Sequence, residues 1–247
     1  MMENLIREDE TLDDLQLKGI HIIQKKEGFR FGVDAALLAN FARIKRSMKV
    51  IDLCSGTGII PLILAGKTEA AKVTGLEIQE EMVEMALRSV RYNKLEDRLD
   101  FIAGDLKDER LLKSMEKADV VTVNPPYKLR GSGIVNPEDK NAIARHEILA
   151  TLEDVIKASR ILLKDNGRLF MVHRPERIAD ILCLMRKYKI EPKAIRMVHP
   201  NSKKAPNIVL VEGQRDGGAF LKWHPPLYVY KDDGGYSHEI NEIYGRR

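Results

Sequence analysis

Four consecutive residues, Asn124, Pro125, Pro126 and Tyr127, form a tetrad suited to binding a planar amino group. They follow the apolar run 120–123, which is typical of a buried strand. The Asn124 side-chain oxygen and the Pro125 carbonyl offer two acceptors to one NH2 group, and the Tyr127 ring can stack on the attached heterocycle. The tetrad therefore predicts a site for the exocyclic amine of an adenine. The alternative is a strand that ends in a diproline turn with a packing tyrosine.

A second motif is the glycine turn at residues 54–58, Cys-Ser-Gly-Thr-Gly, which follows another strand-like run. Gly56 and Gly58 let the backbone approach a ligand closely, the helix that follows offers free N–H groups, and Ser55 is a further candidate contact. The turn lacks the lysine of a P-loop and the third glycine of a dinucleotide fingerprint. Asp52 adds a negative charge, which repels a phosphate and attracts an amine. We therefore expect the turn to hold S-adenosylmethionine.

Two more acidic residues follow the next two predicted strands. Glu77 ends the second strand, where a carboxylate can accept hydrogen bonds from both ribose hydroxyls. Asp105 follows the third strand and could accept a hydrogen bond from the adenine amine, with Ile78 and Leu106 on the two sides of the ring. Each acid alone could be a solvated strand end or a loop charge. Their order along the chain, with the tetrad after the fourth strand, favours one ligand site.

Short β-rich runs alternate with helical patterns from about residue 49 onward. This alternation predicts an α/β fold, with a mostly parallel sheet and helices on both of its faces. The predicted strands span 49–53, 72–77, 99–103, 119–124 and 168–173, and two final strands over 194–199 and 207–212 form a hairpin at the sheet edge; the predicted helices begin at 59 and span 80–92, 152–163 and 175–188. Segment 129–143 has no clear period and is either a lid or an ordinary connection.

The composition limits the class of protein. The chain has 247 residues, of which 44% are hydrophobic, and a net charge of +4, which is compatible with a nucleic-acid partner. Two cysteines argue against a zinc cluster and a disulfide framework and favour a reduced cytoplasm. The acidic first fourteen residues lack the apolar core of a secretory signal, and no apolar stretch reaches the roughly 18 residues of a membrane span. We expect a cytoplasmic monomer without a metal ion.

The ordered acids and the tetrad together resemble the class I S-adenosylmethionine-dependent methyltransferases, and among them the amino-methyltransferases marked by Asn-Pro-Pro-Tyr. The resemblance covers about residues 49–210. It implies a Rossmann-like sheet of seven strands with a reversed hairpin at its edge. It also implies that Asn124 and the Pro125 carbonyl bind the target amine and that Tyr127 stacks on the base.

The N-terminal flank narrows this resemblance. The stretch 28–39, Gly-Phe-Arg-Phe-Gly-Val-Asp-Ala-Ala-Leu-Leu-Ala, resembles the motif of the bacterial tRNA methyltransferases that modify N6 of the adenine beside the anticodon in a valine tRNA. This resemblance implies that Phe31, Val33 and Asp34 lie near the methyl donor. Asp34 could also cap a helix that begins at Ala35.

The tail looks like the same family over residues 205–213, 225–230 and 236–244. We therefore expect one methyltransferase domain over residues 1–247: an N-terminal extension (1–48) that covers the cofactor, a catalytic core (49–213) and a C-terminal tail (214–247). Position 54 holds a cysteine, whereas alanine or glycine is also common at this position in the family that the chain resembles.

A tRNA partner requires cations that meet phosphates. We predict RNA contacts at Arg130, Lys203 and Lys204, although solvated surface charges would look the same in sequence. Further candidates are Lys193, Arg196, His199, Arg43, Lys45 and Arg46.

Two other functions are compatible with the motifs. A protein-glutamine N5-methyltransferase uses the same tetrad on a side-chain amide, but it would be expected to carry an N-terminal domain for its protein partner. A non-catalytic RNA-binding protein could keep the cofactor fold, although the intact acids speak against it.

Overall fold

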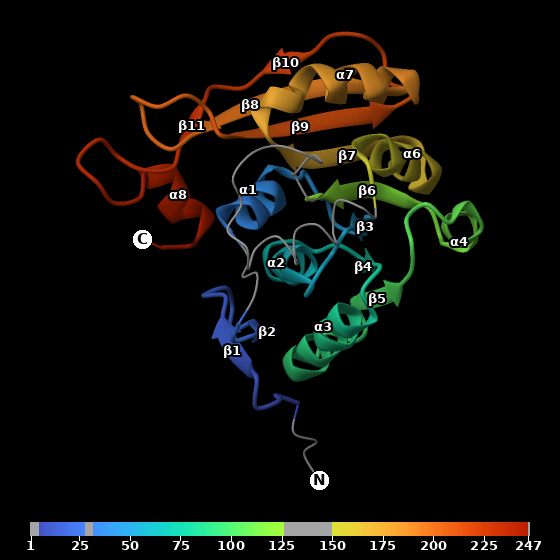
Figure 1. Cartoon of the computed structure of the whole chain (residues 1–247), viewed down its shortest axis with the longest axis vertical. Helices are drawn as coiled ribbons and strands as arrows, with labels where there is room; N and C mark the ends of the chain where they lie inside the picture. Colours follow the sequence, from blue (N-terminus) through green and yellow to red (C-terminus); the bar gives the residue numbers. More distant parts are fainter. Residues whose placement is uncertain (1–4, 28–31, 126–149, 247) are drawn as a thin grey trace.

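A central β-sheet runs through the part of the chain that the computed structural model describes, residues 5–27, 32–125 and 150–246 (Figure 1). Its long strands follow the order β8-β9-β7-β6-β3-β4-β5. They are β3 (Lys49–Leu53), β4 (Lys72–Glu77), β5 (Leu99–Ala103), β6 (Ala118–Val123), β7 (Leu163–His173), β8 (Ile190–His199) and β9 (Ile208–Arg215).

The strand directions confirm the predicted mostly parallel sheet. Strands β3, β4, β5, β6 and β7 pair in parallel, whereas β9 is antiparallel to both of its neighbours, β7 and β8. Two strands of two residues, β10 (Lys222–Trp223) and β11 (Leu227–Tyr228), pair in parallel with β8 (Figure 1). The expectation of seven strands is therefore right for the long strands, and the tail adds two short ones.

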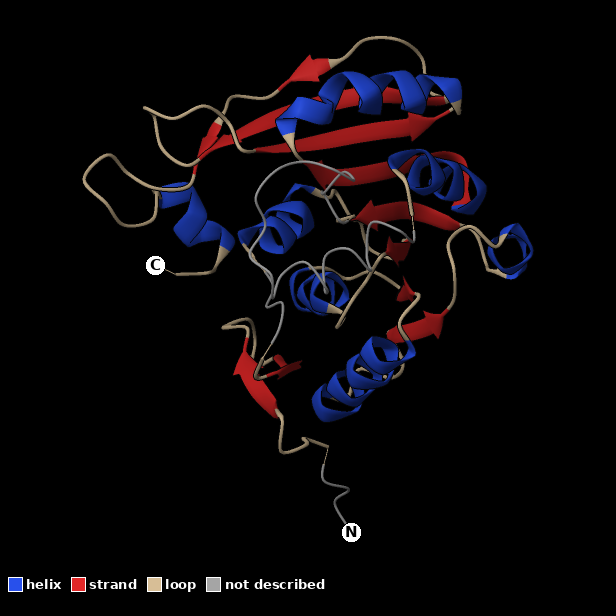
Figure 2. Ribbon diagram, viewed as in Figure 1, coloured by secondary structure: helices blue, strands red, loops and turns tan. Residues whose placement is uncertain are grey.

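Helices cover both faces of the sheet, as the alternating pattern predicts (Figure 2). One apolar cluster joins the sheet to α1 (Val33–Phe41), α2 (Ile59–Lys67), α3 (Glu80–Asn93) and α8 (His238–Ile243). A second cluster joins the other face to α4 (Glu109–Ser114), α6 (Leu152–Leu162) and α7 (Ile178–Lys187), which follows the 3-10 turn η1 (Pro175–Arg177). Within the described residues, none of the helices has the length and apolar character needed to cross a membrane.

Several element boundaries differ from the predicted ones. Strand β7 begins at Leu163, because Asn166 adopts a positive φ of 61° and a bulge between β6 and β7 absorbs a sequence that looks like a turn. Helix α1 begins at Val33, with Gly32 at its N-cap and no side-chain cap. Asp34 therefore lies in the first turn of α1, and the expectation that it caps a helix from Ala35 is wrong.

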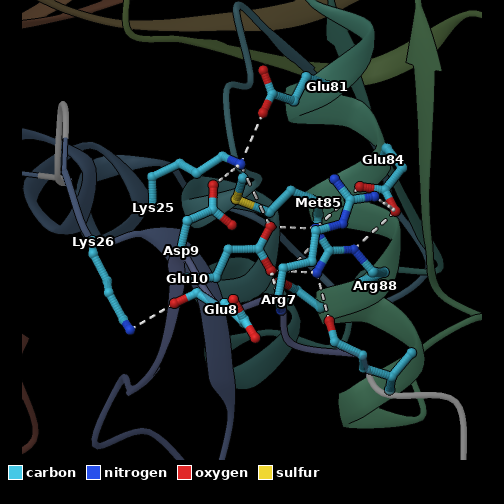
Figure 3. A network of polar contacts seen from close by, with 12 residues as sticks. Arg7, Glu8, Asp9, Glu10, Lys25, Lys26, Glu81, Glu84, Met85 and Arg88 are labelled. Carbon is cyan, nitrogen blue, oxygen red and sulfur yellow. Dashed lines mark hydrogen bonds and ion pairs between the residues drawn. The ribbon is translucent and has the colours of Figure 1, made fainter.

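An N-terminal hairpin, formed by β1 (Glu10–Asp14) and β2 (His21–Lys25), docks on α3 (Figure 3). Its main anchor is Arg88 of α3, whose two terminal nitrogens each donate to one Glu10 oxygen at 2.6 Å. Both side chains are buried. At the other end of the hairpin, the Asn93 side chain accepts from the His21 N–H at 2.8 Å and donates to the His21 carbonyl at 2.6 Å. The hairpin is thus bound to the helix that follows Glu77.

Candidate active site

The parallel strands bring the predicted site residues to one edge of the sheet. Asp52 lies near the end of β3, Glu77 ends β4, Asp105 follows β5 and Asn124 follows β6. Because the carboxyl ends of adjacent parallel strands meet at the same edge, the four residues lie along one edge of the sheet. The register pairs Asp52 directly with Thr122 of β6, two residues before Asn124.

The glycine turn after β3 is open on its outer side. Gly56 and Gly58 have φ values of 54° and 84°, in the left-handed region that favours glycine. A Cβ placed on Gly56 would meet no described heavy atom within 4 Å, whereas a Cβ on Gly58 would lie 2.5 Å from the Phe101 ring. The turn therefore presents bare backbone outward and closes tightly inward.

The inner support of the turn was not predicted from the sequence. Gly75 lies inside β4, and a Cβ there would come within 2.3 Å of the Phe101 ring and 2.7 Å of the Ser55 hydroxyl. Glycine at this position lets Phe101 of β5 lie directly under the turn. A glycine inside a strand is a signal of such a close approach.

Cys54, at the start of the turn, also has a positive φ, of 55°. This conformation strains a residue with a Cβ, which explains why glycine is suited to the position. Burial raises the pKa of its thiol, so the side chain is a neutral thiol at physiological pH.

Asp52 lies beneath the turn and is fully buried. Its two oxygens accept hydrogen bonds from the Ser55 hydroxyl at 2.8 Å and the Thr122 hydroxyl at 2.6 Å. Burial raises the pKa of this carboxyl to about 7, although the two hydrogen bonds act in the opposite direction and lower it. Asp52 therefore ties the glycine turn to β6, and its attraction for a ligand amine stays a prediction.

Glu77 is buried at the tip of β4 and also holds the turn. One of its oxygens accepts the Gly56 N–H at 2.9 Å, and the other accepts the backbone and side-chain N–H groups of Gln79 at 3.1 and 3.2 Å. The oxygen that accepts the Gly56 N–H has a second lone pair, which can accept another hydrogen bond at the sheet edge. Ribose binding by Glu77 stays a prediction that this position supports.

The predicted adenine end of the site lies after β4 and β5. Asp105 is partly exposed, and one of its oxygens accepts the Lys107 N–H at 2.8 Å. Ile78 is an exposed aliphatic side chain, and Leu106 is buried at the same edge. The structure thus brings an acceptor and two apolar side chains to the region expected for the ring, and their roles stay predictions.

Half of the tetrad falls within the described residues. Asn124 is half-buried and Pro125 is buried, directly beyond the end of β6. Pro126 and Tyr127 lie outside the described residues.

The other predicted contacts divide in the same way. Phe31 and Arg130 lie outside the described residues. Val33 and Asp34 form the first turn of α1, which faces the same edge of the sheet because α1 leads back to the start of β3. Lys203 and Lys204 are exposed in the loop between β8 and β9, also at this edge.

His173 is a further polar residue at this edge that the sequence analysis did not select. It ends β7, the strand beside β6, and is buried. Its Nδ1 accepts the Arg174 N–H at 2.8 Å, and burial lowers its pKa to about 4. The ring is therefore neutral at physiological pH with its proton on Nε2, which makes it a donor and not a general base. Its sequence signal was a polar residue at the end of an apolar strand.

A family model described as the methyltransferase small domain matches residues 31–187. The chain belongs to this family. In this methyltransferase the matched span includes the glycine turn, the three acids and the tetrad.

Two relatives carry the same name, "tRNA1(Val) (adenine(37)-N6)-methyltransferase". The protein from Porphyromonas gingivalis is 28% identical over 235 residues, which are 92% of this chain and 91% of that protein. The protein from Flavobacterium johnsoniae is 27% identical over 189 residues, which are 76% of this chain and 79% of that protein.

Solved structures share the fold. A predicted O-methyltransferase from Agrobacterium tumefaciens has a TM-score of 0.70 at 22% identity, covering 86% of this methyltransferase and 95% of that chain. A geranyl diphosphate C-methyltransferase from Streptomyces coelicolor, solved with S-adenosyl-L-homocysteine, has a TM-score of 0.55 at 13% identity, covering 74% and 77%. The class I methyltransferase fold predicted from the sequence is thus confirmed.

No group of three or more histidine, cysteine or acidic side chains that could hold a metal ion occurs within residues 5–27, 32–125 and 150–246.

Proposed function

We propose that this protein transfers a methyl group from S-adenosylmethionine to the exocyclic N6 amine of an adenine in tRNA, next to the anticodon. The observation that carries the proposal is the order of residues along one sheet edge. The glycine turn, Glu77 and Asp105 end three adjacent strands, and Asn124 with Pro125 ends the fourth. The names of the two relatives support tRNA as the substrate.

The residues present fit the methyl donor. The open backbone at Gly56 leaves room where a side chain would project, and the Glu77 carboxylate is fixed at the tip of the next strand. The buried Asp52 carboxyl below the turn, which carries a negative charge when it is ionised, favours a cationic amine over a phosphate. S-adenosylmethionine supplies an electrophilic methyl group when it is bound at this edge.

The tetrad would act on the other reactant, the target amine. The N6 lone pair of adenine is delocalised into the ring, so the amine is a weak nucleophile. Hydrogen bonds accepted by Asn124 and the Pro125 carbonyl favour a pyramidal nitrogen whose lone pair points away from the ring. A carbon–nitrogen bond forms as the carbon–sulfur bond breaks, and the nitrogen then releases a proton to water. His173, neutral and already an acceptor at Nδ1, is not needed as a base.

The target base must leave its stack to reach this edge. An anticodon loop presents unpaired bases, which can be turned outward at modest cost. Tyr127 would replace the lost stacking.

The relatives favour this function over the protein-glutamine alternative, because both are named as tRNA methyltransferases. The non-catalytic alternative predicts cofactor binding without transfer. We also propose that the protein acts in the cytoplasm as a monomer, which light scattering of the purified chain would test.

The direct test is incubation with labelled S-adenosylmethionine and unmodified total tRNA, followed by nucleoside mass spectrometry. We expect N6-methyladenosine in tRNA. Label found only in protein would overturn the proposal.

Asn124→Ala should lower the transfer rate by about 100-fold or more, because one of two fixed acceptors is lost. The affinity for S-adenosylmethionine, measured by calorimetry, should stay within about twofold. An equal loss of cofactor binding and transfer would contradict the role assigned to Asn124.

A further inference from the structure

The C-terminal tail presents two tyrosines outward at the edge of the sheet that carries the site. Leu227 and Val229 are buried in the core, whereas Tyr228 and Tyr230 are 38% and 45% exposed. This alternation follows from the extended backbone of β11 and the residues after it. The register pairs Tyr228 with His199, the last residue of β8, so the exposed rings lie at the carboxyl edge.

The loop between β8 and β9, residues 200–207, is held in place against this tail. The His199 ring donates from Nδ1 to the Lys204 carbonyl at 2.8 Å. It also packs against the Tyr228 ring, with the two ring centroids 5.4 Å apart. The Ser202 hydroxyl donates to Asp232 of the tail at 2.6 Å. The loop and the tail therefore form one ordered surface.

Two lysines of this loop carry charge that the described residues do not neutralise. Lys203 and Lys204 are exposed, and neither ammonium forms an ion pair within the described part of the chain. Two other predicted cations have protein partners. Lys193 donates to the Gly218 carbonyl at 2.9 Å, and Arg196 binds both oxygens of Glu239.

We propose that His199, Lys203, Lys204, Tyr228 and Tyr230, here called the tail platform, bind the single-stranded RNA that flanks the target adenine. This proposal rests on the function proposed above. Proteins bind single-stranded nucleic acid with two kinds of contact: lysines that meet the phosphates, and exposed aromatic rings that stack on the bases. The tail platform offers both.

The position of the tail platform fits this role. Strand β8 is three strand spacings from β6, and β11 lies one spacing further out on the other side of β8, so Tyr228 lies about 19 Å from Asn124 along the same edge. This separation corresponds to a few nucleotides of RNA. The RNA strand that delivers the target base can therefore reach both places at once.

The chain offers a matched control for the aromatic contact. Trp223 of β10 is also exposed, and it pairs with Ile195 in the middle of β8, away from the carboxyl edge. Lys222, beside it, is an exposed lysine at the same remote position.

Tyr228→Ala should raise the KM for tRNA about tenfold, since one stacking contact is lost. The kcat and the affinity for S-adenosylmethionine should not change. Tyr228→Phe keeps the ring and should keep the wild-type KM, and Trp223→Ala should behave like the wild type.

The double variant Lys203→Gln/Lys204→Gln should bind an anticodon stem-loop RNA with a weaker salt dependence, its log–log slope smaller by about 1 to 2. Lys222→Gln should leave the slope unchanged. This variant also tests the proposal if Tyr228→Ala does not fold.

The proposal is overturned if the two tests leave KM and salt slope at wild-type values, or if Trp223→Ala raises KM as much as Tyr228→Ala. A direct measurement of stem-loop RNA binding distinguishes failure of this proposal from failure of the proposed function. A protein that binds the stem-loop through the tail platform but makes no N6-methyladenosine would contradict the methyl-transfer function alone.

Discussion

Asp52 is the residue whose environment most affects the site. Its carboxyl is fully buried, yet it bonds the glycine turn through Ser55 and the strand of Asn124 through Thr122. Desolvation raises its pKa from 3.8 to about 7. One side chain thereby links the glycine turn to the strand that precedes Asn124, and its charge state changes near physiological pH.

The raised pKa gives a stability prediction with a defined sign. Between about pH 4 and 7 the folded state keeps a proton that the unfolded state has lost, so this carboxyl's contribution to stability falls as pH rises through that window. Asp52→Asn removes the titration, and its amide and the two rotatable hydroxyls can still bond each other. The melting temperature of Asp52→Asn relative to wild type should therefore be higher at pH 8 than at pH 5.

Thermal unfolding of both proteins without cofactor at the two pH values checks this prediction. A difference that is the same at pH 5 and pH 8 would show that Asp52 titrates outside this window.

At the scale of elements, the N-terminal hairpin is fixed to α3 by a buried ion pair (Figure 3). Arg88 bonds both oxygens of Glu10, and its Nε donates to Glu84 at 2.9 Å. The hydrogen bonds from Arg88 hold the pKa of Glu10 below its usual range. Removal of the guanidinium would leave the buried Glu10 carboxylate, among the described residues, with only the Arg7 N–H at 2.8 Å and the Lys25 ammonium at 3.9 Å.

Arg88→Met should weaken docking of the hairpin by about 3 kcal/mol, because the buried Glu10 carboxylate would lose the guanidinium that bonds both of its oxygens. Hydrogen exchange of the β1 and β2 amides should become faster, and Arg88→Met/Glu10→Gln should restore part of the protection. Glu116→Gln, which breaks an exposed pair with Lys49, is the control and should leave exchange unchanged. Unchanged hairpin exchange in Arg88→Met would refute the anchoring role.

At the scale of the whole molecule, the tail is part of the core and also extends the sheet. Leu227, Val229, Ile240 and Ile243 are buried in the same cluster as α1 and α2. Lys67 of α2 also donates to the Ile243 carbonyl. The tail platform is therefore positioned by packing, and it is not a loose appendage.

Leu227→Ala should lower the free energy of unfolding by about 3 kcal/mol, because it leaves a cavity in the core. Urea unfolding measures the change. Trp223→Ala, an exposed position four residues earlier, should cost much less. Equal losses would mean that the tail is not part of the cooperative unit.

The sequence alone determined the fold class and the order of the site along the chain. Strands β3, β4 and β5 have the predicted bounds, because each is a short apolar run bounded by turn residues or charges. Local patterns of this kind report which face of an element is buried. The division into extension, core and tail stays a prediction, as do the roles of the site residues.

The tertiary structure decided what lies next to each of these residues. The close packing of Phe101 against Gly75, the bond from Thr122 to Asp52 and the short strands of the tail depend on contacts between segments far apart in the sequence. The sequence pattern does not identify such pairs, because hydrophobic periodicity indicates which residues are buried and not which residues they contact. For the same reason, the pairing of Tyr228 with His199 at the site edge became visible only once the sheet had formed.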